Sequence, residues 1–463
     1  MREKFLLFAV VCFVFVGSVN AQTYPTTKWE DLADTSWYQD SESAFDISTA
    51  EQLAGLAKLV AEGNSFAGKT IKLTDNIDLD GHLWEPIGFS HNFPFSGNVE
   101  GNHHVISNLW ITGLDRDFIG LFGQSVEASY KNINLDTANI MDKGDNSGSL
   151  VANLYTSTME NCHAYNVEIN VDGVTVGGLV GGVLVDGWVK KSSFSGNVTG
   201  DYQVGGFAGS IWDKAEIAEV YVEGNVTANY VVGGLVGFST FTIFPNREST
   251  LRDSYSRANV TATLPVGTVG GAYGVAQAQT NIINVYSTGK VEGLNNVGGF
   301  IGEVGFITAE NNYFDMETSE MTEGVGIEMG APFVLEITGK RTEEMTNVGF
   351  AVALNNGQEG PWLYDATLND GYPGFEGNLS VKDLDLNGVE VSVYPTVTDR
   401  QFFITSTAKA GEYKVFNTAG ALVKSGDLKN KTTQVDINEL NAGVYIVQIQ
   451  ADNKTVSKKI VKK

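Results

Sequence analysis

Cysteine is scarce in this chain, which holds two in 463 residues. Cys12 lies inside a predicted leader, so the mature protein would keep Cys162 alone. A single thiol excludes an intramolecular disulfide, a cysteine-based metal site and a redox pair. Cys162 takes the place that Ser193 and Ser254 hold in later repeats, so we expect a small, buried core residue rather than a reactive thiol.

Histidine is also rare. The five histidines are His82, His91, His103, His104 and His163. None belongs to the His-Glu-x-x-His pattern that places two zinc ligands on one helix face. The glycine-rich segments lack the Lys-Ser/Thr of a phosphate-binding loop. The sequence therefore predicts no metal site, no cofactor site and no zinc peptidase.

Positive charge is scarce over most of the chain. Residues 22–390 carry 17 Lys and Arg against 48 Asp and Glu, whereas residues 391–463 carry 11 against 6. Such an acidic surface repels nucleic acids and anionic membranes. We therefore expect no nucleic-acid partner.

Long apolar runs are absent beyond the N-terminus. The run Phe5–Val16 follows Arg2 and Lys4 and precedes the small residues at 19–21, which predicts a cleaved signal peptide over residues 1–21. An uncleaved anchor is the less favoured alternative because the run is short for a membrane span. No later stretch approaches 18 apolar residues, so we expect an exported protein without a membrane span.

Glycine, by contrast, recurs in a fixed pattern. The box VGGLVG at residues 176–181 has close variants later in the chain and two weaker copies before it. Aligned on the second glycine, the copies lie at Gly120, Ser149, Gly178, Gly206, Gly234, Gly271 and Gly299. The intervals are 28 or 29 residues, with one of 37. This period is typical of a solenoid, in which each repeat buries its apolar face against its neighbours.

A second pattern follows each box, as in SFSGNVT at residues 193–199 and VEGNVT at 222–227. Each period thus holds about three short strands, the content of one coil of a parallel β-helix. The Asn-Val-Thr triplets at 197, 225 and 259 match a glycosylation sequon, but their register favours stacked Asn and Thr ladders. Box glycines such as Gly177 and Gly178 suit positive-φ corners or places of close backbone approach.

The flanking segments predict how the chain is divided. After a lead-in at residues 22–44, the solenoid would span residues 45–314 and open with a helix, Ser48–Val60, that covers the first coil. Residues 315–376, with a short helix near Thr342 and an aromatic closing strand, would cap the far end.

Two further segments complete the chain. Residues 377–390 indicate a linker, and the alternating strands of residues 391–463 indicate a small immunoglobulin-like β-sandwich. The predicted fold class is therefore all-β: a right-handed parallel β-helix, or solenoid, with an N-terminal capping helix and a C-terminal sandwich.

The repeats resemble the GLUG motif of exported bacterial proteins over roughly residues 45–375. Besides the glycine boxes, the resemblance includes WEPIG at residues 84–88 and the turn at residues 101–106, where His103 replaces the usual glycine. It implies a β-solenoid surface protein and fixes no ligand and no reaction. GLUG repeats also occur in IgA-cleaving metallopeptidases, whose zinc motif this chain lacks.

Residues 391–463 resemble the type A sorting domain of the Bacteroidetes type IX secretion system. The matching segments are Val393-Tyr394-Pro395, Tyr413–Gly420, Leu440–Tyr445 and the Lys-rich end, and Thr396 stands where the family usually has Asn. The resemblance implies contact with the secretion machinery and export to the outer cell surface or beyond. Removal of the domain and either release or attachment to surface lipopolysaccharide would follow.

Parallel β-helices also host polysaccharide lyases and glycosidases, which need paired carboxylates or carboxylates with a basic residue. The candidates are Asp75, Asp78, Asp80 and the Lys190-Lys191 pair. In so acidic a chain such groupings arise by chance. The three aspartates could also bind calcium, although their spacing is not that of an EF-hand. We therefore expect no catalytic, cofactor-binding or metal-binding residue.

The insertion behind the 37-residue interval, at residues 242–249, is either a neutral length variant or a binding loop. Together these observations favour a non-enzymatic adhesin or binding module for glycans or surface proteins. The alternatives are a carbohydrate-active β-helix enzyme and a purely structural spacer.

Overall fold

The structure is a computed structural model. It describes residues 25–239, 247–277, 279–366, 369–375, 391–394, 397–398, 400–406, 411–417, 421–428, 432–451 and 454–462. The predicted signal peptide, the predicted linker and most of the insertion at 242–249 lie outside the described residues.

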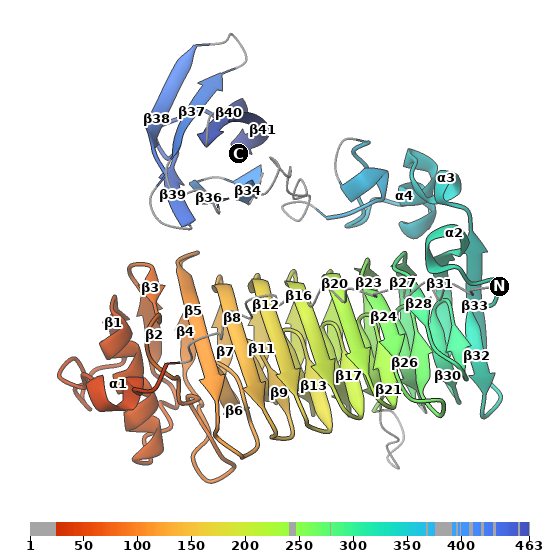
Figure 1. Cartoon of the computed structure of the whole chain (residues 1–463), viewed down its shortest axis with the longest axis horizontal. Coiled ribbons are helices and arrows are strands. Elements are labelled where there is room, and N and C mark those ends of the chain that lie inside the picture. Colours follow the sequence, from red (N-terminus) through yellow and green to blue (C-terminus); the bar gives the residue numbers. More distant parts are fainter. Residues whose placement is uncertain are drawn as a thin grey trace, which may run out of the picture.

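The chain winds into a parallel β-solenoid of about ten turns, followed by a smaller antiparallel domain (Figure 1). One middle coil consists of β13 (Thr175–Gly177), β14 (Val180–Leu184), β15 (Trp188–Lys190) and β16 (Ser193–Gly200). Each strand pairs in parallel with its equivalent in the next coil. The solenoid predicted from the repeat period is confirmed.

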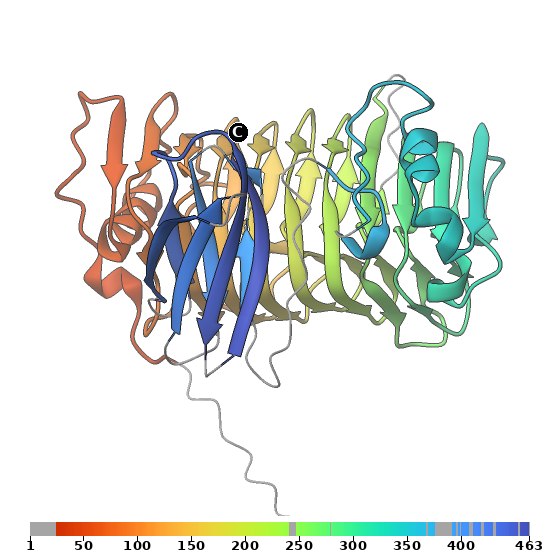
Figure 2. The same ribbon diagram turned by 90° about the horizontal axis from the view of Figure 1, so that it is seen from above.

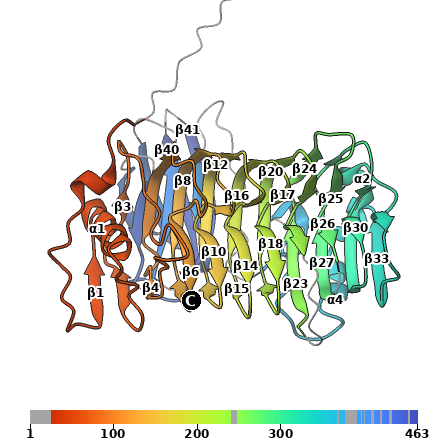
Figure 3. The same cartoon turned by 90° about the horizontal axis from the view of Figure 1, so that it is seen from below.

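Three parallel sheets run along the solenoid in the described part of the chain, and Figure 3 shows β10, β14 and β18 side by side. The eight-stranded sheet contains β6 (Phe122–Val126), β10 (Val151–Tyr155), β14, β18 (Ala208–Trp212), β22 (Val236–Ser239), β26 (Tyr273–Ala276), β30 (Ile301–Val304) and β32 (Val325–Glu328). The six-stranded sheet contains β9 (Ser147–Gly148), β13, β17 (Gln203–Gly205), β21 (Val231–Gly233), β25 (Thr268–Gly270) and β29 (Val297–Gly298).

The third sheet forms the broad outer side of the solenoid and has 19 strands within the described residues. They are β1 (Ala44–Ile47), β2 (Thr70–Leu73), β3 (Ile77–Asp78), β4 (Asn98–Glu100), β5 (Val105–Thr112), β7 (Ser129–Lys131), β8 (Asn134–Asp142), β11 (Thr158–Glu160), β12 (His163–Val171), β15, β16, β19 (Glu216–Ala218), β20 (Tyr221–Ala228), β23 (Ser249–Ser256), β24 (Asn259–Ala262), β27 (Thr280–Ser287), β28 (Val291–Glu292), β31 (Thr308–Asp315) and β33 (Val334–Lys340).

Equivalent residues of successive coils stack in ladders. Asn197, Asn225 and Asn259 occupy equivalent positions in three paired strands. The Asn225 Nδ2 donates to Asn197 Oδ1 at 2.8 Å, and the Asn259 Nδ2 donates to Asn225 Oδ1 at 3.1 Å. The Asn ladder predicted from the Asn-Val-Thr triplets is therefore present.

The box glycines serve close approach and not backbone turning. Neither Gly177 nor Gly178 has a positive φ, so the corner role that we considered is wrong. A Cβ on Gly177 would lie 1.9 Å from Val180 O and 2.7 Å from Gly209 N. The backbone of the same box and of the next coil fills that space. Positive-φ corners fall instead on residues such as Asn161, which tolerate this conformation.

The N-terminal end of the solenoid is covered as predicted. Helix α1 (Ala50–Ala61) starts after Thr49, whose Oγ1 accepts a hydrogen bond from Gln52 N at 3.3 Å. Figure 1 shows α1 at this end, where the lead-in adds the short helix η1 (Trp29–Leu32). The helix joins the solenoid core through side chains that include Leu53, Leu56 and Val60.

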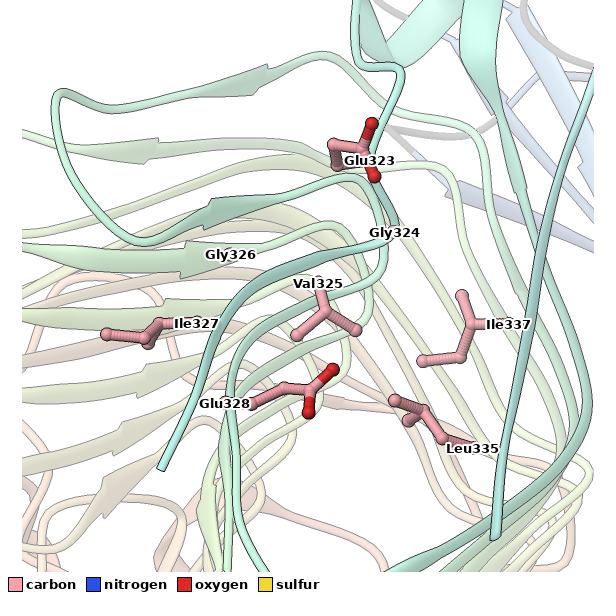
Figure 4. Close-up of a pocket in the computed structure, with 8 residues that line it drawn as sticks. All are labelled: Glu323, Gly324, Val325, Gly326, Ile327, Glu328, Leu335 and Ile337. Carbon is pink, nitrogen blue, oxygen red and sulfur yellow. The ribbon is translucent and has the colours of Figure 1, made fainter. Parts of the chain in front are cut away.

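The far end is built differently from our expectation. Helix α2 (Met316–Ser319), β32 and β33 complete the last coil. Between β32 and β33 the core opens to an end cavity of about 400 Å³, lined by backbone and side chains of residues 323–328 with Leu335 and Ile337 (Figure 4). This cavity is the open end of the core.

The rest of the segment expected to close this end, from Thr342 onward, lies instead along one side of the solenoid (Figure 2). Helix α3 (Thr342–Met345) begins where predicted and leads into α4 (Val348–Leu354). No closing strand forms in its described residues; the short helix η2 (Asn369–Gly371) is followed by an isolated antiparallel bridge between Gly374 and Leu363. The segment packs on the outward rings of Tyr255 and Tyr286, which stack at 5.0 Å. The stacked rings form an apolar surface on the side of the solenoid, and the segment packs there because it buries that surface.

The C-terminal domain has two sheets around one core, as expected for a small sandwich. One sheet contains β34 (Val391–Tyr394), β36 (Gln401–Ser406) and β39 (Thr432–Asp436). The other contains β35 (Val397–Thr398), β37 (Gly411–Asn417), β38 (Leu422–Asp427), β40 (Gly443–Ala451) and β41 (Lys454–Lys462). Phe402 of the first sheet and Val447 of the second belong to the same buried cluster.

The glycine box yields a stability prediction. We expect Gly177→Ala to lower the free energy of unfolding by about 3 kcal/mol, because its Cβ would meet rigid backbone on two sides. The matched control is Gly305→Ala, whose Cβ would have its nearest neighbour at 3.6 Å. Urea unfolding of both variants measures the difference, and equal midpoints would contradict the close-approach explanation.

Candidate binding surface

Asp75 and Asp78, two of the three aspartates singled out in the sequence, accept hydrogen bonds from groups close to them. Asp78 Oδ1 accepts hydrogen bonds from Asp80 N at 3.0 Å and from Asn108 Nδ2 at 2.8 Å. Asp75 Oδ1 accepts one from the neighbouring Asn76 N. In the part of the chain that the structure describes, no group of three or more His, Cys, Asp or Glu could hold a metal ion. These hydrogen bonds give Asp75 and Asp78 a structural role.

The Lys190-Lys191 pair belongs to a surface ion-pair group. Lys190 Nζ lies 3.5 Å from Glu216 Oε1 and 5.3 Å from the centre of the Trp188 ring. Glu216 also accepts hydrogen bonds from Arg252. Lys191 has a positive φ and forms a corner of the coil. Lys190 is thus paired with neighbouring side chains, whereas the Lys191 side chain is exposed.

His82 and His91 lie against aromatic rings. The His82 ring lies 4.6 Å from the Trp29 ring at an angle of 55°, and His91 packs edge to face with Phe118. His163 is half-buried in the outer sheet, where its ring nitrogens lie 2.8 Å from Ser193 Oγ and 3.1 Å from Asn161 Oδ1. Burial lowers the pKa of His163 to about 4, so the ring is neutral in the folded protein at pH 7.

Cys162 is a buried core residue. Burial raises the pKa of its thiol to about 12, which disfavours the reactive thiolate. The predicted repeat position needs a correction of one residue. Ser193 pairs with His163, while the Oγ of Ser192 accepts a hydrogen bond from Cys162 N at 3.1 Å.

A row of exposed apolar side chains crosses five successive coils at the turn before each glycine box. We call it the apolar ridge, and its members are Val174, Tyr202, Tyr230, Val266 and Leu294, with exposed fractions of 42%, 42%, 36%, 68% and 72%. The rings of Tyr202 and Tyr230 lie 5.3 Å apart.

Backbone hydrogen bonds fix the spacing of the ridge. The carbonyl of Val174 accepts from Gln203 N, next to Tyr202, at 2.6 Å, and that of Tyr202 accepts from Val231 N at 2.8 Å. In the next two coils the register changes: Val231 pairs with Thr268, and Val269 pairs with Val297, so Gly267 stands opposite Tyr230 while Val266 and Leu294 lie one residue out of line. Coils paired in this way are about 4.8 Å apart, so Val174, Tyr202 and Tyr230 follow one another at that spacing.

Polar groups follow the ridge on one side. Asp201 Oδ1 accepts a hydrogen bond from Asn229 Nδ2 at 2.7 Å, and Asn229 Oδ1 accepts one from Thr263 Oγ1 at 2.6 Å. Asp145 lies one coil before Val174 and accepts from its backbone N at 2.7 Å. Apolar faces beside polar groups and negative charge suit a ligand with apolar and hydroxyl surfaces and no negative charge.

We did not predict the ridge from the sequence. Its signal is an apolar residue two positions before the first valine of a box, as in Val174, Tyr202 and Tyr230. Inward and outward positions of the short turn cannot be separated by alternation alone, because the two-residue period breaks at the turn. The strand pairs of the structure show which residues of the turn are exposed.

Comparison with known proteins defines the C-terminal domain. The family model described as "Secretion system C-terminal sorting domain" matches residues 392–463. The protein is therefore a secreted β-solenoid protein with a type IX sorting tail, and the tail engages the type IX secretion machinery. Among the described helices, none has the length and apolar character that a membrane span requires.

Two curated proteins match parts of the chain. A protein of Evansella cellulosilytica described as "Putative Gly-rich membrane protein" is 31% identical over 124 residues, which are 27% of this chain and 14% of that protein. "Halomucin" of Haloquadratum walsbyi is 30% identical over 162 residues, 32% of this chain and 2% of that protein. This chain thus spans a small part of the length of these curated relatives.

A solved structure resembles the chain in fold. It is described as "a putative immunoglobulin A1 protease from Bacteroides ovatus", and its TM-score is 0.49 at 19% sequence identity. The alignment covers 73% of this chain and 93% of that chain. A likeness of this size concerns the fold alone.

The half-buried His163 predicts a pH dependence of stability. Between pH 6.5 and pH 4 the unfolded chain binds a proton at His163 that the folded chain does not bind, so stability falls as the pH falls through this window. The loss from this site amounts to about 3 kcal/mol. We expect His163→Asn to lose less stability from pH 7 to pH 4.5 than the parent, as measured by urea unfolding. Equal losses would contradict the assignment.

Proposed function

We propose that this protein is a non-enzymatic binding protein that acts at the cell surface or outside the cell. Its ligand, a glycan or a surface protein, lies along the apolar ridge. The observation that carries the proposal is the ridge itself: Val174, Tyr202 and Tyr230 are exposed in register on a repeated scaffold, and Val266 and Leu294 are exposed at the turns of the next two coils. Contiguous exposed apolar surface on a soluble protein is typical of interaction sites.

The negative charge of the protein restricts the class of ligand that can bind. Residues 22–390 carry 17 basic and 48 acidic residues, and acids such as Asp145 and Asp201 adjoin the ridge. Anionic polymers would be repelled from this surface. An uncharged or basic ligand is favoured.

A carbohydrate-active enzyme remains the second candidate, and the surroundings of its candidate residues favour binding without reaction. Asp75 and Asp78 hold turns, and Lys190 is paired with Glu216. A glycosidase needs a carboxylate pair aimed at one bond of its substrate. Residues held in local turns and exposed ion pairs are poorly placed for that task.

The sorting tail sets the proposed location. Export by the type IX system fits our proposal that the repeats are GLUG repeats and that the source is a member of the Bacteroidetes. We further propose that a signal peptide directs the first export step and that residues 391–463 are removed at the surface. The solenoid would then be released or attached to lipopolysaccharide, in either case with the ridge facing its ligand.

The proposal predicts ridge-dependent binding. A glycan and matrix-protein array should show saturable binding by the protein, and Tyr202→Ala with Tyr230→Ala should weaken that binding at least tenfold. The expected size follows from the loss of two aromatic contacts of about 0.5–1.5 kcal/mol each beyond buried area. Titration of the best array ligand measures the change.

Tyr155→Ala is the control, because Tyr155 is 37% exposed and lies in another sheet. Equal effects of all three substitutions would remove the ridge from the binding site. The same samples are assayed for reducing and unsaturated sugar. Release of a sugar product would contradict the binding proposal and support a carbohydrate-active enzyme. A protein that neither binds nor releases product in any assay would favour a structural spacer.

A further inference from the structure

The far end of the solenoid has two strands with a free edge. In the described part of the chain, β32 pairs with β30 alone and β33 pairs with β31 alone. Each of these last strands therefore has one edge whose backbone N–H and C=O groups have no strand partner in the described residues. Such an edge is a template for pairing with another chain.

The apolar core is also incompletely covered at this end. Val325, Leu335 and Ile337 pack against the solenoid core but are only partly buried, and they line the end cavity (Figure 4). Met329 and Phe333, in the turn between β32 and β33, are exposed. An occupant that covers this end must therefore bring apolar side chains as well as a strand.

The same end of a second copy meets both requirements. Two copies that meet end to end about a two-fold axis bring β33 beside β33 of the other copy, in antiparallel direction. Leu335 and Ile337 of both copies then face one shared interior. A head-to-tail stack does not achieve this, because α1 packs over the core of the first coil. A peptide strand alone would pair with the edge and leave most of the cavity open.

The charges of β33 suit this antiparallel pairing. Leu335 and Ile337 line the cavity, so strand alternation turns Glu336, Thr338 and Lys340 outward. When the two strands are centred on Thr338, Glu336 of each copy lies opposite Lys340 of the other. Opposite charges in facing positions stabilise a strand pair, whereas centring on Glu336 would set the two glutamates against each other. The charges thus select one symmetric register.

Both charged groups have only modest contacts within one copy. Glu336 Oε2 accepts a hydrogen bond from Asn311 N at 3.3 Å, and Lys340 Nζ lies 5.4 Å from the centre of the Tyr313 ring. The Glu336 residue is exposed. Pairing across two copies therefore demands no buried contact to be broken.

We infer that the protein forms a symmetric end-to-end dimer, in which β33 of each copy adds to the free edge of the other and the two open cores close against each other. The second copy is held by backbone pairing, by the shared apolar interior and by two Glu336–Lys340 ion pairs. This inference goes beyond the proposed function. It leaves the ridge of each copy free.

Sedimentation velocity of the full chain over a concentration series tests the inference. We expect a monomer–dimer equilibrium. Glu336→Lys and Lys340→Glu should each raise the dissociation constant about tenfold, because each change sets like charges opposite each other twice in the symmetric interface. The control is Glu62→Lys, which makes the same change of charge at the exposed end of α1 and should leave the dimer as it is.

A mixture of the two single variants tests the register itself. One copy then carries Lys at both positions and the other carries Glu at both, so every facing pair again joins opposite charges. The mixture should associate about tenfold more tightly than either variant alone. Urea unfolding of each single variant shows whether the solenoid itself remains intact.

The contrary outcomes are distinct. A chain that stays monomeric throughout the series would overturn the inference and leave an extended segment of another protein as the occupant of this end. A dimer that keeps its affinity in both variants, or a mixture that regains none, would also overturn it. A dimer abolished by Tyr202→Ala with Tyr230→Ala would show that the copies meet through the ridge. Ligand binding by the ridge is measured separately, so the proposed function stands or falls independently.

Discussion

The close backbone contact within the glycine box is the constraint on which the rest of the structure depends. The absence of a side chain at Gly177 lets β13 fold back against β14 while Gly209 of the next coil lies against both. Because this contact recurs from coil to coil, the coils keep one shape and one spacing. A residue type that recurs at one position of the repeat therefore becomes a ladder along the solenoid.

The solenoid has two rows of outward-facing aromatic side chains, of which one is covered by another segment of the chain and one is exposed. On the outer sheet, the stacked rings of Tyr255 and Tyr286 are buried beneath the segment at residues 342–375, and the Tyr286 hydroxyl donates to Pro373 O at 2.6 Å. On the ridge, Tyr202 and Tyr230 have no such cover within the described residues. The chain thus covers one apolar ladder with its own segment and leaves the other exposed, which is the basis of the proposed binding role.

The parts of the fold that depend on local signals were predictable. The repeat period gave the coils, Thr49 marked the start of α1, and the Asn-Val-Thr triplets gave the Asn ladder. What failed was long-range placement. The segment after Tyr313 carries aromatic residues that would suit a cap or a side cover equally well, and only the stacked partners across three coils decide between them. The ridge was missed for the same reason, since its members are about 28 or more residues apart.

The acidic character of the solenoid explains how an apolar ridge can remain exposed. Apolar side chains in a row would favour association between copies. Each copy, however, brings a large excess of Asp and Glu over Lys and Arg in residues 22–390, so two ridges that approach each other also bring together surfaces of like charge. An uncharged ligand meets no such repulsion. The negative charge therefore disfavours association of two ridges and leaves the ridge accessible. It also favours uncharged ligands over anionic ones.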